Sequence, residues 1–340
     1  MENNGTEKIL EMQGVKTYFF TDDGVVKAVD GVDIHISKGE ILGLVGESGC
    51  GKSVTSLTTM RLVGPPGKTI EGEILFQGRD LQKLSEEEMT SIRGNEMAMI
   101  FQEPGTALNP VQKVGSQISE VLMRHLDLKK EDAWQRAVDL LVDVKIPDAE
   151  QRAHAYPHEL SGGMAQRVMI AMALACDPVL LIADEPTTAL DVTIQAQILN
   201  LVSDLREKTQ TAVLLITHDL GVVADSCDRV AVMYAGNIVE QATTDEIFHN
   251  AKHPYTMGLL QSIPVIGERT DRLDVIPGVV PSLIDLPPGC RFAPRCKQRV
   301  EHDINICTEI DPELQVVPNE DGHLVRCWLY HDYDGHAAPY

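Results

Sequence analysis

A short glycine-rich segment near the start of the chain most limits what this sequence can fold into. It reads Gly46-Glu47-Ser48-Gly49-Cys50-Gly51-Lys52-Ser53 and matches the pattern G-x-x-x-x-G-K-[ST]. The apolar run at residues 40–45 predicts a strand before it, and residues 54–62 predict a helix after it. Strand, glycine-rich turn and helix in this order predict a P-loop, whose inward-pointing backbone N–H groups and helix N-terminus bind phosphate.

All eight P-loop residues are therefore predicted to bind a nucleotide. The Lys52 side chain supplies a compact cation for the β and γ phosphates, and the Ser53 hydroxyl is a ligand for Mg²⁺. The motif alone does not distinguish a kinase, a motor, a GTPase and a transporter ATPase.

A pair of carboxylates narrows this choice. Asp184 and Glu185 follow the apolar run at residues 179–183, about 130 residues after the P-loop. Taken alone, they would predict a helix N-cap. Beside a P-loop, they predict that Asp184 holds Mg²⁺ through water and that Glu185 orients or deprotonates the attacking water. Hydrolysis is favoured over a kinase reaction, because no feature of the sequence indicates a second substrate site.

The apolar runs also indicate the fold class. Residues 40–45, 179–183 and 211–217 are continuous apolar segments that end in turns, as in the buried strands of a mainly parallel α/β sheet. The more polar region at about 105–175 predicts an inserted helical subdomain. After about residue 250, proline and glycine punctuate the sequence. We therefore expect a first domain at 1–250 and a loop-rich module at 251–340.

Charge and hydropathy exclude several functions. With 29 Lys and Arg against 51 Asp and Glu, the net charge of -22 argues against binding to nucleic acid or to anionic lipid. No apolar run approaches the roughly 20 residues that a bilayer-spanning helix needs. Residues 1–5 have neither the basic nor the apolar part of a secretion signal. We expect a chain that is neither secreted nor membrane-spanning.

A second motif, Leu160-Ser161-Gly162-Gly163-Met164-Ala165-Gln166-Arg167, stands about 20 residues before Asp184. A serine and two glycines that open a helix place a hydroxyl and unpaired amides at its positive end, which predicts a second anion site. With this motif the sequence resembles the ATP-binding cassette (ABC) proteins. The resemblance implies a P-loop NTPase with a RecA-like core, an antiparallel β subdomain and a helical subdomain.

In that family each ATP lies between the P-loop of one subunit and this signature motif of another. The resemblance therefore implies ATP-driven dimer closure, in which the partner's ATP is contacted by the signature residues Ser161, Gly162, Gly163 and Gln166.

Further positions match the family one by one. The resemblance implies that Gln102 contacts the metal and water and senses a membrane partner, and that His218 contacts the γ-phosphate and positions Glu185. It also implies that Asp191 belongs to the D-loop at the dimer interface. An aromatic residue of Tyr18-Phe19-Phe20 is expected to stack on adenine, with Phe19 favoured over Tyr18, although all three could simply pack in an edge strand. Since no position is degenerate, we expect an active ATPase.

Other segments indicate a subfamily: Gln102-Glu103-Pro104, Ala107-Leu108-Asn109-Pro110, Tyr156-Pro157-His158-Glu159 and His253-Pro254-Tyr255-Thr256. They resemble the ATP-binding subunits of oligopeptide, dipeptide and nickel importers. This resemblance implies two membrane-spanning permease subunits, a second and related ATPase subunit, and an extracytoplasmic solute-binding protein. It places the chain as a peripheral protein on the cytoplasmic face of the cell membrane.

Alternatives remain at this stage. The solute could be nickel or another small molecule. The chain could instead be a soluble ABC protein of DNA repair or of ribosomes, although it has neither the long coiled-coil insertion of the first nor the second cassette usual in the other.

Four of the seven cysteines lie near the end of the chain, at Cys290, Cys296, Cys307 and Cys327. Four thiols without a secretion signal predict a metal or cluster site. The tight C-x₂₋₄-C spacing typical of structural zinc is missing, and four thiolates can hold a [4Fe-4S] cluster, which the family resemblance implies here. Zinc, unrelated buried thiols and a disulfide pair remain alternatives. Arg291, Arg295, Lys297 and Arg299 are expected to offset the charge of a cluster.

Cys50 lies inside the P-loop itself. One hypothesis is that the loop amides and Lys52 lower its pKa, so that oxidation or alkylation would block ATP. The simpler interpretation, a residue that fills space in the loop, is favoured.

Overall fold

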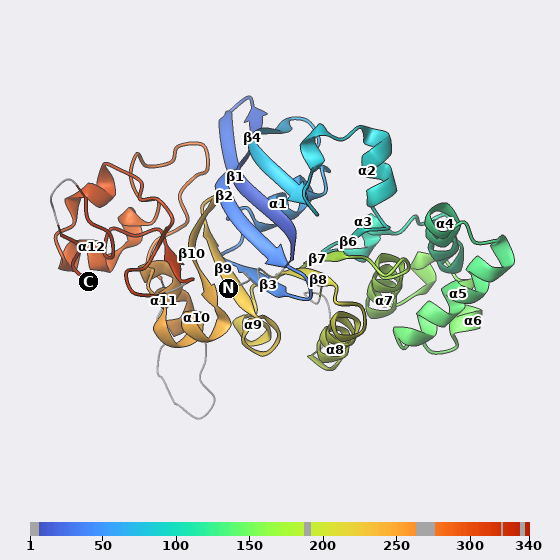
Figure 1. Ribbon diagram of the computed structural model, residues 1–340. Helices are drawn as coiled ribbons and strands as arrows, with labels where there is room; N and C mark the ends of the chain where they lie inside the picture. Colours follow the sequence, from blue (N-terminus) through green and yellow to red (C-terminus); the bar gives the residue numbers. More distant parts are fainter. Residues whose placement is uncertain (1–6, 187–191, 263–275, 321, 334–336) are drawn as a thin grey trace, which may run out of the picture. The chain divides into compact units, whose positions relative to one another are not determined.

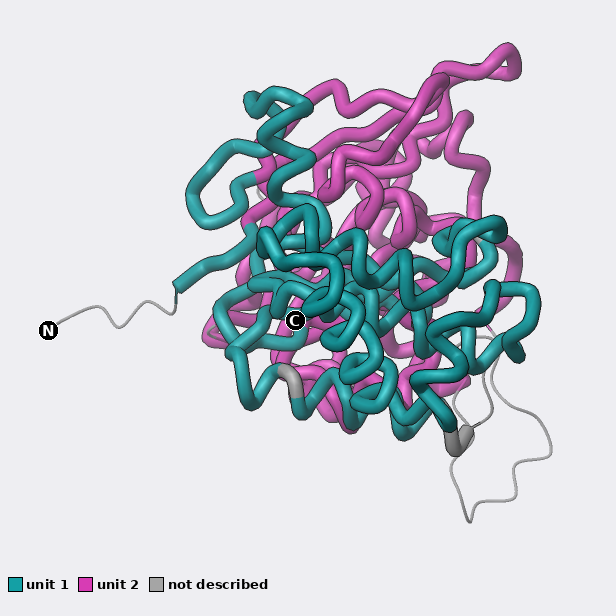
Figure 2. Tube along the Cα trace, turned by 90° about the vertical axis from the view of Figure 1, so that its right-hand side faces the viewer, with its two compact units in different colours: residues 1–10, 35–41, 75–216 teal, residues 11–34, 42–74, 217–340 magenta. Residues whose placement is uncertain are grey.

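The computed structural model of the chain describes residues 7–186, 192–262, 276–320, 322–333 and 337–340. The chain divides into two compact units, which Figure 2 distinguishes by colour. The first contains residues 1–10, 35–41 and 75–216, and the second contains residues 11–34, 42–74 and 217–340. The second unit thus holds residues on both sides of position 250, and the predicted domain boundary there stays a prediction.

The first unit is built on three parallel strands. They are β6 (Met97–Ile100), β7 (Leu180–Asp184) and β8 (Ala212–Ile216), and every residue in them is buried. β7 pairs with β6 on one side and with β8 on the other, and Leu180 stands opposite both Met97 and Ala212. The sequence prediction of buried parallel strands at 179–183 and 211–217 is confirmed to within one residue.

One helix, α2 (Glu86–Ile92), precedes β6, and the other helices fill the chain between the three strands (Figure 1). They are α3 (Pro104–Ala107), α4 (Val114–Leu126), α5 (Lys130–Asp143), α6 (Ala149–Ala153), α7 (Gly162–Ala173) and α8 (Val192–Thr209). In α4 the residues Val114, Ile118 and Leu122 are spaced four apart, so they share one face, and all three are buried. Single-turn 3₁₀ helices occupy Leu81–Lys83 and Pro157–Glu159, and β5 (Arg79–Asp80) pairs antiparallel with the end of β4 (Gly67–Phe76).

The second unit contains two groups of strands. One has the order β2-β1-β4, where β1 is Lys8–Thr21 and β2 is Gly24–Ser37. The other has the order β11-β12-β10-β9-β3, with bounds β3 (Ile41–Val45), β9 (Arg229–Tyr234), β10 (Asn237–Thr243), β11 (Gln315–Val316) and β12 (Leu324–Val325). β3 runs parallel to β9, whereas β10 pairs antiparallel with both β9 and β12.

The helices of the second unit are short. They are α1 (Lys52–Thr59), α9 (Leu220–Ser226), α10 (Thr244–Asn250), α11 (Pro254–Gln261) and α12 (Lys297–Glu301), with 3₁₀ turns at Ala293–Arg295 and Asn305–Thr308. Apolar residues of α9, α10 and α11 share a core that includes Tyr234, Tyr255 and Phe292. This core therefore joins the strand beside the P-loop strand to residues from the C-terminal part of the chain.

One buried carboxylate fastens the start of α11 and strand β12 to β10. Glu240 is fully buried, and it accepts hydrogen bonds from the backbone N–H groups of Lys252 (2.6 Å) and His253 (2.9 Å). The ring Nε2 of the buried His323 lies 2.8 Å from the same carboxylate. Satisfying a buried charge in this way fixes the position of α11.

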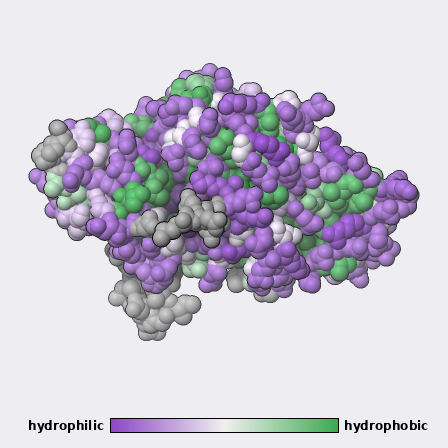
Figure 3. Space-filling view, in the orientation of Figure 1, coloured by the Kyte–Doolittle hydropathy of each residue, from purple (hydrophilic) through white to green (hydrophobic). Residues whose placement is uncertain are grey.

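The surface agrees with the strongly acidic composition. The described part of the face drawn in Figure 3 is mostly hydrophilic, with scattered hydrophobic patches. Among the described residues, no helix has both the length and the apolar character that crossing a bilayer requires.

Candidate nucleotide site

The P-loop connects the end of β3 at Val45 to the start of α1 at Lys52, as the sequence predicts. Two of its glycines lie against neighbouring backbone. A Cβ atom at Gly46 would lie 2.2 Å from the carbonyl oxygen of Met233, and one at Gly51 would lie 2.2 Å from that of Ala28. Gly51 also has a φ of 115°, in the region that favours glycine. At these two positions the loop therefore has room for a hydrogen atom but not for a side chain.

Lys52 is folded over the loop that it belongs to. Its Nζ donates hydrogen bonds to the carbonyl oxygens of Gly46 (2.8 Å) and Glu47 (3.2 Å), and the residue is buried. The following Ser53 is exposed at the first turn of α1. A buried ammonium group and an exposed hydroxyl at a helix N-terminus suit a Mg²⁺-bound polyphosphate.

Cys50 fills space and is not an activated thiol. It is fully buried, and burial raises the pKa of its thiol, although the nearby Lys52 ammonium opposes this. The hypothesis that the loop lowers the Cys50 pKa is therefore wrong in sign, because the desolvation of a thiolate outweighs the attraction of one cation.

The two carboxylates predicted to act in hydrolysis lie at the carboxyl end of β7. Asp184 is the last residue of the strand and is buried. Glu185 follows with a φ of 46°, and its backbone N–H donates to the carbonyl oxygen of Ile216 at 2.9 Å. Gln102 Nε2 donates to the Glu185 carboxylate at 2.9 Å. The structure thus brings together two residues that are 83 positions apart and that the sequence analysis had assigned to the attacking water.

A non-glycine residue with positive φ carries backbone strain, and such strain is concentrated at functional sites. At Glu185 the strained conformation is held by the bond to Ile216 and by the contact with Gln102. The carboxylate is therefore fixed in orientation before any substrate arrives.

The signature motif begins α7. Ser161 is the N-cap, and its hydroxyl accepts a hydrogen bond from the backbone N–H of Met164 at 3.3 Å. Ser161 and Gly162 are exposed, and Gly163 is half-buried. Gln166 is buried instead, and its Nε2 donates to the carbonyl oxygen of Pro186 at 2.7 Å. Gln166 thus connects the signature helix to the segment that follows Glu185.

Two further predicted residues are not found with Gln102 and Glu185 in the described part of the first unit. His218 is exposed and lies in the second unit, just before the Asp219 N-cap of α9, whereas Gln102 and Glu185 lie in the first unit. Asp191, predicted for the D-loop, falls outside the described residues.

The three candidate aromatics differ in their surroundings. The Tyr18 hydroxyl donates to Asp30 at 2.5 Å, and burial together with this carboxylate raises the pKa of Tyr18. Phe19 is half-buried, with its ring over Gly67, where an added Cβ would lie 2.6 Å from it. Phe20 is half exposed to solvent. The assignment of Phe19 to adenine stays a prediction.

The sequence analysis missed two residues that contact the P-loop. Arg295 forms an ion pair with Glu47 at 2.8 Å, and the hydroxyl of Tyr255 accepts a hydrogen bond from the Glu47 backbone N–H at 2.9 Å. Arg291 pairs with Asp30. Arg291 and Arg295 were expected to offset the charge of a cluster, and the structure instead pairs both with carboxylates. The motif His253-Pro254-Tyr255 was the one signal that could have pointed to Tyr255.

The four C-terminal cysteines are free thiols in the second unit. Burial raises the pKa of Cys290 to about 12 and of Cys307 to about 11, and it raises those of Cys296 and Cys327 as well. Across the described part of the chain, no three His, Cys, Asp or Glu side chains form a group that could hold a metal ion. The predicted [4Fe-4S] site is therefore not confirmed.

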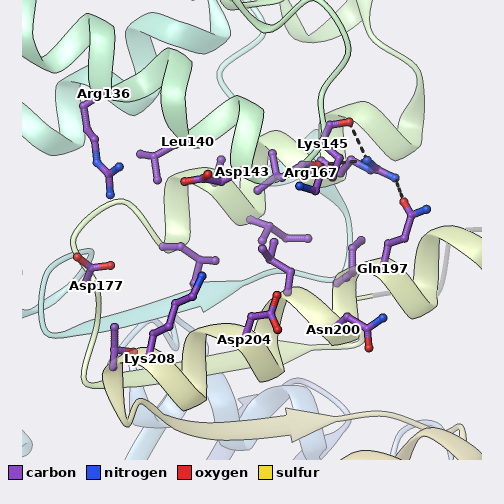
Figure 4. A pocket seen from close by; sticks show the side chains of 17 residues that line it. Arg136, Leu140, Asp143, Lys145, Arg167, Asp177, Gln197, Asn200, Asp204 and Lys208 are labelled. Atoms are coloured by element: carbon purple, nitrogen blue, oxygen red, sulfur yellow. Dashed lines mark hydrogen bonds between the residues drawn. The ribbon is translucent and has the colours of Figure 1, made fainter.

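A cavity of about 730 Å³ lies in the first unit between α5, α7 and α8 (Figure 4). None of the predicted nucleotide residues lines it. Its most buried cation, Arg167, donates hydrogen bonds to the carbonyl oxygens of Val144 and Lys145 and to the side chain of Gln197. This guanidinium is therefore already occupied by groups of the protein.

Comparison with known proteins places these features in context. Residues 29–188 match the family model described as "ABC transporter", and residues 239–302 match "Oligopeptide/dipeptide transporter, C-terminal region". The chain is 55% identical to the oligopeptide transport ATP-binding protein AppD of Bacillus subtilis, over 95% of this chain and 97% of that protein. It is 49% identical to the dipeptide transport ATP-binding protein DppD of the same organism, over 98% of each.

Two solved structures have a similar fold. The ATP-binding cassette MJ0796, in a dimeric post-hydrolysis state bound to ADP and Pi, superposes with a TM-score of 0.64 at 27% identity. The match covers 69% of this chain and 98% of that one. Another, cbiO1 from Clostridium perfringens, gives a TM-score of 0.60 at 26% identity, over 72% of this chain and 92% of that one.

Because Gly51 lies so close to neighbouring backbone, adding one methyl group at this position should weaken nucleotide binding. We expect Gly51→Ala to weaken MgATP binding by about tenfold or more relative to the control, because the added methyl group would lie 2.2 Å from the Ala28 carbonyl oxygen and the loop would have to shift, at a cost on the order of 1–3 kcal/mol. The matched control is Gly49→Ala, where φ is also positive at 79° but no atom lies within 4 Å of the added Cβ. Titration calorimetry of the two variants would measure this. Equal dissociation constants would show that the contact with Ala28 is not what shapes the loop.

Proposed function

The chain belongs to the ABC transporter family of ATP-binding proteins, in the branch with an oligopeptide/dipeptide transporter C-terminal region, and from this we propose that it drives peptide uptake. In this proposal the chain is the ATP-hydrolysing subunit of a membrane importer of oligopeptides or dipeptides. The observation that carries it is the contact between Gln102 and Glu185 at the end of β7, in a chain about half identical to peptide-transport ATPases along nearly its whole length.

We assign the chemistry to the chain's own residues as follows. Lys52 exchanges its bonds to Gly46 and Glu47 for oxygens of the β and γ phosphates. Glu185, held by Gln102, orients the attacking water and takes its proton. His218 stabilises the charge that develops on the γ-phosphate.

Mg²⁺ is expected with ATP in this family. The donor set suits it: Ser53 presents a hydroxyl, Gln102 an amide and Asp184 a carboxylate, and hard oxygen ligands are those that Mg²⁺ prefers. When bound, the ion neutralises phosphate charge and orients the β and γ phosphates.

The exposed Ser161 and Gly162 support an assignment to the ATP of a second subunit. A helix N-terminus with an exposed serine hydroxyl favours an anion. Gly163 and Gln166 complete the motif, and Asp191 is assigned to the interface between the two ATPase subunits. Closing and opening of this dimer would drive two permease subunits between their two access states.

The other partners follow from the same assignment. The second ATPase subunit is a related chain, and an extracytoplasmic binding protein delivers the solute to the permease. The chain then acts on the cytoplasmic face of the cell membrane, held by contacts with the permease. The C-terminal region favours this reading over a repair or ribosomal ABC protein. Nickel or another small solute is the alternative cargo.

We also propose that the four C-terminal cysteines hold a [4Fe-4S] cluster. What supports this is that all four are in one segment of the second unit, and that Cys290 donates its backbone N–H to the carbonyl oxygen of Cys307 at 2.9 Å. The backbone N–H of Arg299 also points at the Cys296 sulfur, at 3.4 Å. As described, the thiols do not form a ligand set, so they would have to converge and lose their protons on binding. No step of hydrolysis is derived through a cluster.

Removing the proposed base tests the hydrolytic assignment. We expect Glu185→Gln to lower kcat for ATP by about 100-fold or more, the usual contribution of a general base, while MgATP still binds. Phosphate release and nucleotide binding would be measured side by side, with Glu207→Gln on the exposed face of α8 as the control. Normal steady-state hydrolysis by Glu185→Gln would refute the role of this carboxylate.

The cluster proposal predicts iron and acid-labile sulfide in chain purified without oxygen. Cys307→Ser should lose both, since a buried serine is a poor substitute for a thiolate ligand. Cys176→Ser, outside the quartet, should keep both. Zinc in place of iron, or no metal at all, would return the quartet to the alternatives that the sequence leaves open.

A further inference from the structure

Glu47, the second residue of the P-loop, is held at three separate groups. Its backbone N–H donates to the Tyr255 hydroxyl at 2.9 Å, and its carbonyl oxygen accepts from Lys52 Nζ at 3.2 Å. Its carboxylate receives both terminal nitrogens of Arg295, at 2.8 Å and 3.2 Å. Two of the three holding residues come from beyond position 250, and all lie in the same compact unit as the P-loop.

Arg295 uses every N–H group that it has. Two bonds go to the Glu47 carboxylate, and the other three go to the Tyr234 hydroxyl (3.3 Å) and to the carbonyl oxygens of Pro277 (2.9 Å) and Ile276 (3.4 Å). Its side chain is only 5% exposed. Burial alone would lower the pKa of Arg295, but the bonds to Glu47 and Tyr234 raise it, so the guanidinium stays charged. A planar fork that is fully satisfied in this way fixes its partner in both position and orientation.

Aromatic rings support this arrangement from one side. The ring centroid of Tyr234 lies 4.6 Å from that of Tyr255 and 5.3 Å from that of Phe292. The Arg295 guanidinium lies 5.8 Å and 5.9 Å from the centroids of Tyr234 and Phe292. Such rings hold a cation and restrict its rotamers. The position of Arg295 is therefore set by packing as well as by hydrogen bonds.

Tyr255 is fixed just as firmly. It is fully buried in the first turn of α11, where its backbone N–H donates to the side chain of His253 at 3.1 Å. The backbone N–H of His253 in turn donates to the buried Glu240. The hydroxyl of Tyr255 is thus a rigid acceptor for Glu47.

The far end of the loop is held through a second arginine. Gly236 donates its backbone N–H to the carbonyl oxygen of Cys50 at 2.8 Å, and Arg291 donates to the carbonyl oxygen of the preceding Ala235 while pairing with Asp30. The short segment from Arg291 to Arg295 therefore acts on both ends of the P-loop.

We propose that Arg295 and Tyr255 are positioning residues of the nucleotide site, which hold Glu47 so that the loop amides are already arranged for phosphate. Neither residue touches the nucleotide. A glycine-rich loop loses conformational freedom when it binds a ligand, and holding it in advance removes part of that cost. The C-terminal region is thereby part of the ATP site, and a change in its conformation alters ATP affinity. The proposal rests on the nucleotide-binding role proposed for the P-loop.

The test uses the full-length chain and measures the MgATP dissociation constant, KM and kcat. We expect Arg295→Met to raise the dissociation constant and KM by about fivefold to tenfold, a coupling typical of residues in direct contact, with kcat within about twofold. Glu47→Ala should do the same, and the double variant should be no weaker than either single one, because both remove one interaction. Arg295→Lys should not restore affinity, since an ammonium group has no fork.

A second variant covers the case in which Arg295→Met does not fold. Tyr255→Phe removes a single hydroxyl and should raise the dissociation constant in the same direction, with kcat retained. Arg79→Gln, which removes an ion pair to Glu96 in the other unit, is the matched control and should bind like wild type.

Two results separate the possible failures. If the wild-type chain binds MgATP no better than Lys52→Ala, the nucleotide site itself is wrongly assigned. If the wild type binds in a Lys52-dependent manner but folded Arg295→Met and Tyr255→Phe bind equally well, only the positioning role is overturned. Additive losses in the double variant would also contradict it.

Discussion

The structure depends most on the contact of the P-loop backbone with strands β2 and β9. The carbonyl oxygens of Ala28 and Met233 occupy the space where side chains at Gly51 and Gly46 would lie. This contact turns the loop back on itself, so that Lys52 folds over it and α1 begins directly behind it. A phosphate site made of backbone amides needs such a support, because the amides point inward only while the loop is held.

The remaining chemistry follows from where buried strands end. β3 ends at the P-loop, β7 ends at Asp184 and Glu185, and β8 is followed by His218. These strands are completely buried, so each residue assigned to the chemistry stands at the end of a rigid element. Strain at Glu185 and its bond from Gln102 then fix the direction of the carboxylate.

Local sequence patterns predicted part of the fold and of the candidate site, but they did not predict contacts between residues that are far apart in the sequence. The P-loop and the buried strands follow from motifs and apolar runs, whereas the hydrogen bond between Gln102 and Glu185 is seen only in the structure. The ion pair of Glu47 with Arg295 could not be predicted in this way. The two residues are 248 positions apart, and no motif around Arg295 indicates which carboxylate it binds. The hypothesis of a lowered Cys50 pKa has the wrong sign for a related reason, since the loop sequence does not reveal how deeply the thiol is buried. The four cysteines indicated a metal or cluster site, but their spacing fixes neither where their side chains lie nor what they bind.

We propose that ATP held by this P-loop drives the uptake of peptides. The most direct measurement is uptake of a labelled oligopeptide into proteoliposomes that contain the permease pair and both ATPase subunits, with ATP enclosed and binding protein outside. We expect peptide to accumulate only when ATP is enclosed, and accumulation to stop when this chain carries Lys52→Ala. Peptide uptake without ATP, or ATP-dependent uptake of nickel with no uptake of peptide, would contradict it.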